Sequence, residues 1–289
     1  MENSLTIGAP YSVLILTYNE RGSIESTIAS IPEDVSVTVL DSGSTDGTIE
    51  IASEQGAEII EHPFGGFGTQ RNYGIEADPC PLDWQLHLDA DERMTPALDA
   101  AIRKELGDEP RPDAFALPNR TMLNGRWLRW SSSYPVYQTR LVNRRRARFI
   151  NQGHGQQEAD GTVVAVLHEP YIHDAFIKGI DAWIEKHNRY SRAEVDAENA
   201  GAIELKLRDL ISLDRRNRRR ALRELSRQLP FAPLLRSIHT LILRGGILDG
   251  RAGIQYSQML ALYEQMKRIK RLDGRLGSTR TTSRTDLVT

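Results

Sequence analysis

The stretch Trp84-Gln85-Leu86-His87-Leu88-Asp89-Ala90-Asp91-Glu92 begins as an apolar segment and ends in carboxylates. Leu86 and Leu88 alternate with polar residues, which is the period of a half-buried β-strand. Asp89 and Asp91 follow where such a strand ends. Because the chain leaves regular pleating there, both carboxylates can turn toward one cation, and oxygen ligands favour Mg²⁺ or Mn²⁺ over zinc. An isolated Asp-x-Asp also fits a solvated acidic turn. Only other motifs in the chain can distinguish such a turn from a metal site.

The first part of the chain predicts alternating strands and helices. Apolar runs predict strands at 12–17, 35–40 and 57–61, and amphipathic segments predict helices at 23–31 and 48–55. A β-α-β-α-β order is typical of a parallel sheet with right-handed crossovers. We therefore expect an α/β fold with a mostly parallel central sheet.

Polar clusters follow three of the predicted strands. Thr17-Tyr18-Asn19-Glu20 follows the first strand, Asp41 to Thr48 follows the second, and Asp89-Ala90-Asp91 follows a later one. Open parallel sheets bind ligands beyond the carboxyl ends of their strands. The three clusters together therefore predict a ligand site at one edge of the sheet.

A glycine-bearing loop, Phe64 to Tyr73, lies between the second and third clusters. Thr69 can start a helix, and Arg71 near that start suits a phosphate, because guanidinium and helix N-terminal N–H groups both attract anions. A surface loop with a solvated arginine is the alternative. The loop is not a P-loop, since no Gly-Lys-Ser/Thr follows, and it is not at the first strand–helix turn, where a dinucleotide fingerprint would lie.

The middle of the chain adds two further candidates. Residues 119–149 are rich in arginine and tryptophan, and aromatic rings beside guanidinium groups bind sugars and anions, although a mixed sheet with half-buried tryptophans also fits. His173 follows an apolar pair. Beside two aspartates it would complete a divalent metal site, but a lone histidine is more often a core or surface residue than a ligand, and spacing alone does not distinguish them.

The net charge of −2 hides an asymmetry, because residues 201–275 hold 17 Lys/Arg against 7 Asp/Glu. A basic segment indicates an anionic partner. No run reaches the ~18 apolar residues that span a bilayer, and Glu2 stands where a signal peptide would be positive. The lone Cys80 excludes an internal disulfide and suits a reducing compartment. We therefore expect a cytoplasmic protein.

These patterns predict a catalytic domain over 1–200, a basic helical region over 201–275 and a disordered Ser/Thr-rich tail over 276–289. A helix is expected at 203–227, with an arginine cluster at 215–220.

Residues 231–243 place apolar side chains at i, i+3, i+4 spacing beside arginines, and a second helix is expected at 252–271. This pattern fits a helix lying on an anionic membrane surface. It also fits a hairpin packed on the catalytic domain or a contact between copies in a homo-oligomer. Nucleic acid is disfavoured, because no recognised binding module accompanies the charge.

Three motifs, Leu16–Glu20, Asp41–Thr48 and Asp89-Ala90-Asp91, resemble in order and distance the inverting glycosyltransferases of family two. That family has the GT-A fold, and the resemblance covers about residues 10–175. Within the family, the chain is similar to bacterial lipopolysaccharide-core and related envelope enzymes, which work at the cytoplasmic membrane face. Leu243–Gly253 is similar to a segment of those enzymes. The resemblance implies a nucleotide-sugar donor, with UDP-sugars first among the candidates, and a membrane-associated glycan or glycolipid acceptor.

The resemblance also implies roles for single residues. Asp91, assisted by Asp89, would hold Mg²⁺ or Mn²⁺ on the donor diphosphate, and Arg71 would lie near that diphosphate. His173 resembles the later histidine that some GT-A enzymes add to the metal. The residues implied for the nucleotide-sugar pocket are Thr17, Asn19, Glu20, Asp41, Ser42, Asp46, Arg71 and Asp89.

Inverting transfer needs a carboxylate that deprotonates the acceptor hydroxyl. Relatives often carry a His-Glu pair after the arginine- and tryptophan-rich segment, but here His154 is followed by Gly155. We expect Glu158 to be the base and Asp174 to be the second candidate.

Two other functions fit parts of the pattern. One is a non-catalytic nucleotide-sugar-binding protein on a GT-A scaffold. The other is a nucleotidyltransferase, which needs a glycine- and arginine-rich phosphate loop after the first strand, and Asn19–Gly22 matches such a loop poorly.

Overall fold

The computed structural model describes residues 8–107, 112–152, 155–200, 214 and 231–285, and it divides the chain into two compact units. The first unit contains the chain up to Trp127 and Ser133–Ile177. The second contains Leu128–Ser132 and the chain from Lys178 onward. The boundary therefore lies near residue 178, whereas the composition places it at residue 200.

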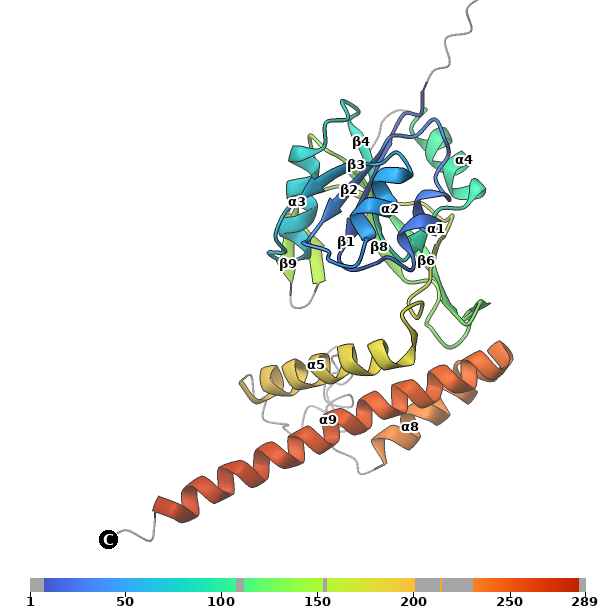
Figure 1. Cartoon of the computed structure of the whole chain (residues 1–289). Helices are drawn as coiled ribbons and strands as arrows, with labels where there is room; N and C mark the ends of the chain where they lie inside the picture. The colour runs from blue at the N-terminus through green and yellow to red at the C-terminus, as the bar shows by residue number, and fades with distance from the viewer. Residues whose placement is uncertain (1–7, 108–111, 153–154, 201–213, 215–230, 286–289) are drawn as a thin grey trace, which may run out of the picture. The chain divides into compact units, whose positions relative to one another are not determined.

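Half of the main sheet in the first unit is parallel. The strands β3 (Glu58–Glu61), β2 (Val37–Asp41), β1 (Ser12–Thr17) and β4 (Trp84–Asp89) lie side by side in this order (Figure 1). The strands predicted at 12–17, 35–40 and 57–61 are confirmed to within two residues. The order β2-β1-β4 places the strands that carry the three polar clusters next to one another.

The other half of the sheet is mixed. β8 (Tyr137–Asn143) runs antiparallel to both β4 and β6 (Ala114–Leu123), and β12 (Tyr171–His173) joins β6 to β5 (Glu92–Arg93). The short strands β7 (Arg126–Trp127) and β11 (Val164–Val166) also pair with β6, while β9 (Phe149–Gln152) and β10 (Gly155–Glu158) form a separate hairpin.

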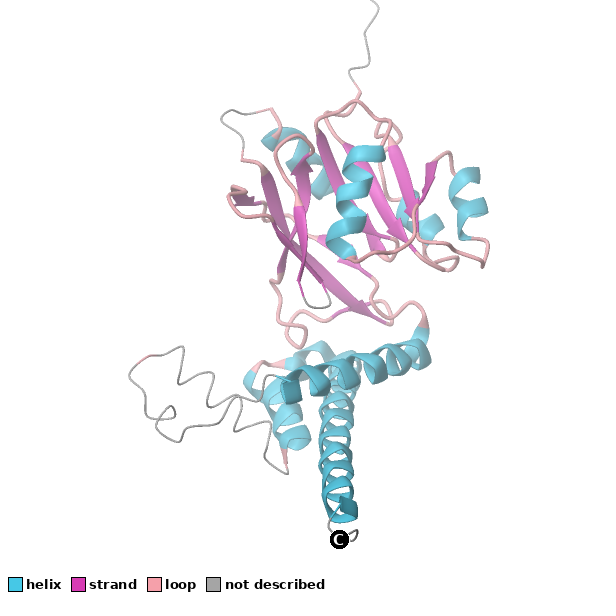
Figure 2. Ribbon diagram, turned by 90° about the vertical axis from the view of Figure 1, so that its left-hand side faces the viewer, coloured by secondary structure: helices cyan, strands magenta, loops and turns pink. Residues whose placement is uncertain are grey.

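The strand β1 is buried on both faces, which explains its unbroken apolar sequence. Val13 and Ile15 belong to one hydrophobic cluster, whereas Leu14 and Leu16 belong to another on the opposite face. Side chains alternate across a strand, so a continuous apolar run covers both faces at once. Helices pack beside the sheet in the first unit (Figure 2).

The helices of the first unit are α1 (Ile24–Ile28), α2 (Thr48–Glu54), α3 (Phe67–Ala77) and α4 (Pro96–Glu105). The hydroxyl of Thr95 accepts a hydrogen bond from the Leu98 N–H and caps α4, and Pro96 occupies its first turn. Helix α3 packs very closely on β1, because a Cβ at Gly74 would come within 2.3 Å of Leu14 Cδ2.

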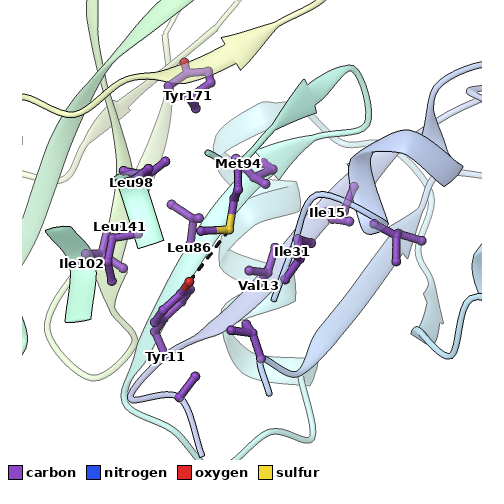
Figure 3. Close-up of a cluster of buried hydrophobic side chains, with 14 of the residues drawn as sticks. Tyr11, Val13, Ile15, Ile31, Leu86, Met94, Leu98, Ile102, Leu141 and Tyr171 are labelled. Atoms are coloured by element: carbon purple, nitrogen blue, oxygen red, sulfur yellow. Dashed lines mark hydrogen bonds between the residues drawn. The ribbon is translucent and has the colours of Figure 1, made fainter. Parts of the chain in front are cut away.

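The larger hydrophobic cluster joins β1, β4 and β8 to α1 and α4 (Figure 3). Leu86 of β4, Leu98 of α4 and Leu141 of β8 are fully buried in it. The Tyr11 hydroxyl reaches Met94 Sδ at 3.9 Å and donates to Asp99 at 2.7 Å, so its polar atom is satisfied within the core.

The described part of the second unit is helical (Figure 2). It contains α5 (Gly179–Ala200), α8 (Ala232–Ile238), the π-helical turn η1 (His239–Leu243), the 3₁₀ turn η2 (Gly246–Asp249) and α9 (Gly250–Thr285). Helix α5 belongs here because its polar side chains contact α9. Glu194 accepts from the Tyr263 hydroxyl at 2.6 Å, and Lys270 donates to Asn188 and Ser191 at 2.7 Å.

Helix α9 continues to Thr285, although the composition predicts disorder over 276–289. Residues 286–289 and the predicted helix at 203–227 with its arginine cluster lie outside the described residues. Within the described part of the chain, none of the helices has both the length and the apolar content needed to cross a bilayer.

Candidate active site

The three predicted polar clusters meet at the carboxyl edge of the parallel strands. Thr17 at the end of β1 is in register with Asp41 at the end of β2, and Leu16 is in register with Asp89 at the end of β4. The Ser42 N–H donates to the Thr17 carbonyl at 3.0 Å, which holds the two loops together beyond the strands. The predicted gathering of the clusters at one edge is therefore confirmed.

The loops after β1 and β2 interlock through side chains. The hydroxyl of Ser44 accepts from the Asn19 N–H at 2.8 Å, and Asn19 Oδ1 accepts from the Thr45 N–H at 2.9 Å. The Glu20 N–H donates to Thr48 Oγ1 at 2.9 Å. Asn19 has a left-handed backbone (φ 53°), a conformation that asparagine tolerates better than most residues. The two motifs thus stabilise each other's conformation.

The acidic residues of the second loop, Asp41 and Asp46, accept hydrogen bonds from backbone N–H groups of the two loops. The carboxylate of Asp41 is fully buried and accepts from the N–H groups of Gly43 and Ser44, each at 2.7 Å. Asp46 accepts from Thr48 and from the Arg21 N–H. Partial burial raises the pKa of Asp46, but these hydrogen bonds outweigh it and hold that pKa below its usual range. Ser42 accepts from Gln70 of α3 at 3.1 Å.

Asp89 lies between two buried arginines. Its Oδ1 is 2.7 Å from Arg71 Nη2, and its Oδ2 is 2.9 Å from Arg140 Nη2. Burial alone would raise the pKa of Asp89, but the two guanidinium charges outweigh it and hold the pKa far below its usual range. Both carboxylate oxygens are therefore engaged. The role of Asp89 beside Asp91 on one cation stays a prediction, and in this structure the two oxygens of Asp89 contact the two arginines.

Asp91 faces His173 across neighbouring strands. The antiparallel pairing of β12 with β5 places His173 opposite Glu92, and its Nε2 lies 3.5 Å from Asp91 Oδ2. Burial lowers the pKa of His173, but the hydrogen bond to Asp91 and the nearby carboxylates outweigh it and raise the pKa to about 9. In the absence of a metal, the imidazole is therefore protonated at neutral pH.

Asp91 and His173 offer one oxygen and one nitrogen donor whose spacing would suit a divalent ion. Two ligands at right angles on Mg²⁺ or Mn²⁺ lie about 3 Å apart, close to the distance between these side chains. Among the described residues, no three His, Cys, Asp or Glu side chains form a metal cage by themselves. Such a cage is not required, because Mg²⁺ sites commonly use one or two protein carboxylates together with substrate phosphates.

Two buried residues of this site, Arg140 and Glu92, are not among the residues that the sequence analysis assigns to the nucleotide sugar or the metal. Arg140 belongs to the arginine- and tryptophan-rich segment 119–149, which was a general candidate for binding sugars and anions. Arg140 on β8 donates to Glu92 Oε1 at 2.5 Å, and Glu92 Oε2 accepts from the Asp89 N–H at 3.0 Å. Burial raises the pKa of Glu92 above its usual range, against the attraction of Arg140. One signal was available in the sequence: Arg140 precedes the buried Leu141 and Val142, and a charged residue in a buried strand needs a counter-ion.

Arg71, which the sequence predicts near a phosphate, is buried at the sheet edge. Its Nη2 contacts Asp89, and its Nε donates to Gln156 of β10 at 2.6 Å. Nη1 is buried and has no hydrogen-bond partner among the described residues. Burial and the charge of Arg140 lower the pKa of Arg71 to about 10, so the side chain stays cationic at neutral pH. An unsatisfied, buried cationic donor indicates a site for an anion.

The β9–β10 hairpin caps the helix that carries Arg71. The first turn of α3 has no capping side chain of its own, but Asn151 Oδ1 of β9 accepts from the N–H groups of Gly68 at 2.8 Å and Thr69 at 3.3 Å. The approach is so close that a Cβ at Gly68 would lie 2.7 Å from the Ile150 carbonyl carbon. The hairpin and α3 therefore hold Arg71 from both sides.

Replacing Asn151 by alanine should lower the free energy of unfolding by about 1 kcal/mol, because two N–H groups at the start of α3 lose their acceptor. Asn151→Asp keeps an acceptor oxygen at the positive end of the helix and should cost less. Denaturant unfolding of both variants measures the difference. Equal losses for the two substitutions would contradict the capping role.

A pocket of about 580 Å³ opens beside these residues. Arg71, Asp89, Arg140 and the predicted base Glu158 all line it. The second candidate, Asp174, is not among the lining residues, and its Oδ2 is 2.6 Å from Arg93 Nη2. The pocket therefore brings Glu158 together with the charged cluster, whereas Asp174 is held in an ion pair.

The sequence matches a known family over this domain. The family model described as Glycosyl transferase family 2 matches residues 12–169, more than half of the chain. An uncharacterized glycosyltransferase of Rickettsia felis is 31% identical over 143 residues, which are 48% of this chain and 50% of that protein. The lipopolysaccharide core biosynthesis glycosyltransferase LpsC of Rhizobium meliloti is 25% identical over 203 residues, which are 65% of this chain and 72% of that protein.

The chain thus spans about half the length of the Rickettsia relatives that it matches. Among solved structures, the mannosyltransferase PcManGT of Pyrobaculum calidifontis in complex with GDP-Man and Mn²⁺ is 18% identical, with a TM-score of 0.48, and the match covers 92% of this chain and 88% of that one. The family match and the three motifs at one sheet edge establish the assignment: the chain belongs to glycosyltransferase family 2, and its first unit is a GT-A type α/β domain.

Proposed function

We propose that this glycosyltransferase moves a sugar, with inversion, from a nucleotide-sugar donor to a glycan or glycolipid acceptor of the cell envelope, with UDP-sugars first among the donors. The observation that carries the proposal is a pair of features at one sheet edge. Asp91 and His173 form a two-ligand metal position, and the buried Nη1 of Arg71 has no hydrogen-bond partner among the described residues. A metal-bound diphosphate would satisfy both features.

The residues of the site would stabilise the leaving group. Attack on the anomeric carbon expels a nucleoside diphosphate, and Mg²⁺ or Mn²⁺ on Asp91 and His173 would neutralise the charge that develops there. Arg71 supplies a fixed, dry cationic donor that needs no reorganisation during the reaction. Asp89 holds Arg71 and Arg140 in position through its two oxygens.

Glu158 is the best candidate for the base. It lines the same pocket as Asp89 and Arg71, so an acceptor hydroxyl in this pocket can reach its carboxylate. Asp174 is a weaker candidate, since a carboxylate held by Arg93 is less free to accept a proton. Deprotonation of the acceptor hydroxyl by Glu158 would supply the base that an inverting displacement needs.

The lining of the pocket supports a saccharide acceptor. Neutral amide side chains gather there and offer both donors and acceptors to sugar hydroxyls, with the ring of Tyr137 beside them. We propose that this acceptor is attached to a lipid at the cytoplasmic face of the membrane. The amide residues are Gln138, Gln152, Gln156 and Gln157.

The test is a screen of nucleotide sugars with the purified chain and Mn²⁺, with release of nucleoside diphosphate and labelled product as readouts. We expect one donor class to be hydrolysed slowly without acceptor and faster when an envelope glycolipid extract is added. Absence of both hydrolysis and calorimetric binding for every donor, with and without metal, would refute the proposal.

Metal affinity should depend on pH, because the proton on His173 competes with the ion. The pKa of about 9 means that the imidazole must lose its proton to bind metal below that pH. The apparent affinity for Mn²⁺ should therefore rise by about tenfold per pH unit between roughly pH 6.5 and 8.5. Calorimetry in buffers of different protonation enthalpy measures both the affinity and the proton released. Release of no proton at about pH 7 would contradict a role for His173 as ligand.

A further inference from the structure

One end of the helical unit exposes an unusual concentration of large apolar side chains. Ile242 and Leu243 at the end of η1 are 68% and 74% exposed, and Ile247 and Leu248 of η2 are each 61% exposed. Three further apolar side chains of α8 are exposed, namely Leu234, Leu235 and Ile238. Leu234, Ile238 and Ile242 are four residues apart in sequence, a spacing that places side chains on one face of a helix. Contiguous exposed apolar surface of this kind marks an interaction site.

The exposed and half-exposed charged side chains of the stretch 231–251 have one sign. Between residues 231 and 251 the sequence contains Arg236, Arg244 and Arg251. The single acidic residue of that stretch, Asp249, is buried. It accepts from the N–H groups of Trp130 at 3.1 Å and Ser131 at 2.8 Å, so its charge is used internally. The surface is therefore apolar and cationic.

Asp249 also brings an indole to this surface. The hydrogen bonds from Trp130 and Ser131 to Asp249 attach the segment Leu128–Ser132 to the helical unit. The indole of Trp130 in this segment is half exposed. A Cβ built on Gly245 would lie 3.7 Å from the Trp130 ring and 3.6 Å from Leu248 Cδ1, so the indole and Leu248 flank the same turn. Indoles prefer the boundary between lipid tails and headgroups, where an apolar ring and a polar N–H are both satisfied.

We infer that this surface, formed by α8, η1, η2 and Trp130, inserts into the headgroup region of an anionic lipid bilayer. Apolar side chains, flanking arginines and an indole form the combination that interfacial membrane helices use. A second copy of the chain is a poorer occupant. A two-fold interface would place this cationic surface against itself, with no exposed acidic residue between 231 and 251 to pair with the arginines.

The inference rests on the proposed function in one respect only. Membrane binding would serve that function by bringing the enzyme to a lipid-linked acceptor. Binding to lipid is testable without any reaction.

The experiment is vesicle co-sedimentation of the full chain with phosphatidylglycerol-containing and pure phosphatidylcholine vesicles. We expect strong binding to the anionic vesicles that falls as salt is added. The variant Ile242→Ser/Leu243→Ser/Ile247→Ser/Leu248→Ser should bind at least about tenfold more weakly. Arg236→Gln/Arg244→Gln/Arg251→Gln should lose a factor of roughly five per arginine on anionic vesicles. The matched control Val163→Ser/Val166→Ser, which removes exposed valines from the first unit, should bind like the parent chain.

Thermal melts and donor hydrolysis without vesicles accompany each variant. Both should be unchanged in the serine variant, because its four substituted side chains in η1 and η2 are exposed. Vesicle binding by the parent chain that is equal on both lipids, or undetectable, overturns the inference. So does a concentration-dependent dimer that the serine variant abolishes while vesicle binding persists. If donor hydrolysis and calorimetric donor binding are both absent in the parent chain but anionic vesicle binding behaves as expected, the proposed function is refuted and the membrane surface stands.

Discussion

Replacing Arg140 by methionine should lower the free energy of unfolding by about 3–5 kcal/mol, because it removes one partner from a buried ion cluster. Arg140 is 3% exposed and donates to both Asp89 and Glu92. Without it, Glu92 loses its nearest cation, so its pKa, which burial already raises to about 7, rises further. Glu92 then takes up a proton at neutral pH, which recovers part of the loss. Urea unfolding followed by circular dichroism measures the change.

Arg145→Met is the matched control for this prediction. Arg145 is also a salt-bridged arginine of the first unit, but it is largely exposed beside Asp83, so its replacement should cost no more than about 1 kcal/mol. The double variant Arg140→Met/Glu92→Gln should be less destabilised than the sum of the single variants, since neither buried charge is then left alone. A loss for Arg140→Met as small as that for Arg145→Met would contradict the structural role of the cluster.

Replacing Asp91 by asparagine should lower kcat/KM by roughly 10³-fold, because the leaving diphosphate would lose the neutralising ion, which contributes several kcal/mol to transition-state stabilisation. The fold should be kept. Asp91 is partly exposed, and the hydrogen bond from the Asp174 N–H uses its backbone carbonyl, which the substitution retains. Steady-state kinetics with the donor concentration varied give kcat/KM, and calorimetric titration with Mn²⁺ measures the loss of metal binding.

Asp83→Asn provides the comparison, because Asp83 precedes the same strand, β4, at its other end. It should leave both turnover and Mn²⁺ affinity unchanged. Glu158→Gln separates the two roles: it should keep Mn²⁺ affinity and lose turnover, since it removes a base and no metal ligand. Turnover of Asp91→Asn within about threefold of the parent chain would show that the metal is held elsewhere.

The strands and helices around the site could be predicted because local patterns determine them. The apolar run of β1 has the same bounds in the sequence pattern and in the structure. The meeting of Thr17, Asp41 and Asp89 at one edge followed from a general property of parallel sheets. The strand β8 was not predicted, because Arg140 interrupts its apolar pattern and its partners β4 and β6 are distant in sequence.

The sequence by itself determined the family, the α/β class and the sheet edge that carries the site, because motif order and hydrophobic period are local properties of the chain. Only the tertiary structure decided which side chains the two aspartates of the opening stretch contact. Asp89 and Asp91 look equivalent in sequence, but Asp89 meets two arginines brought by α3 and β8, while Asp91 meets His173 brought by β12. The charge of a carboxylate is fixed by its residue type, whereas its partner is fixed by strand pairing between distant segments.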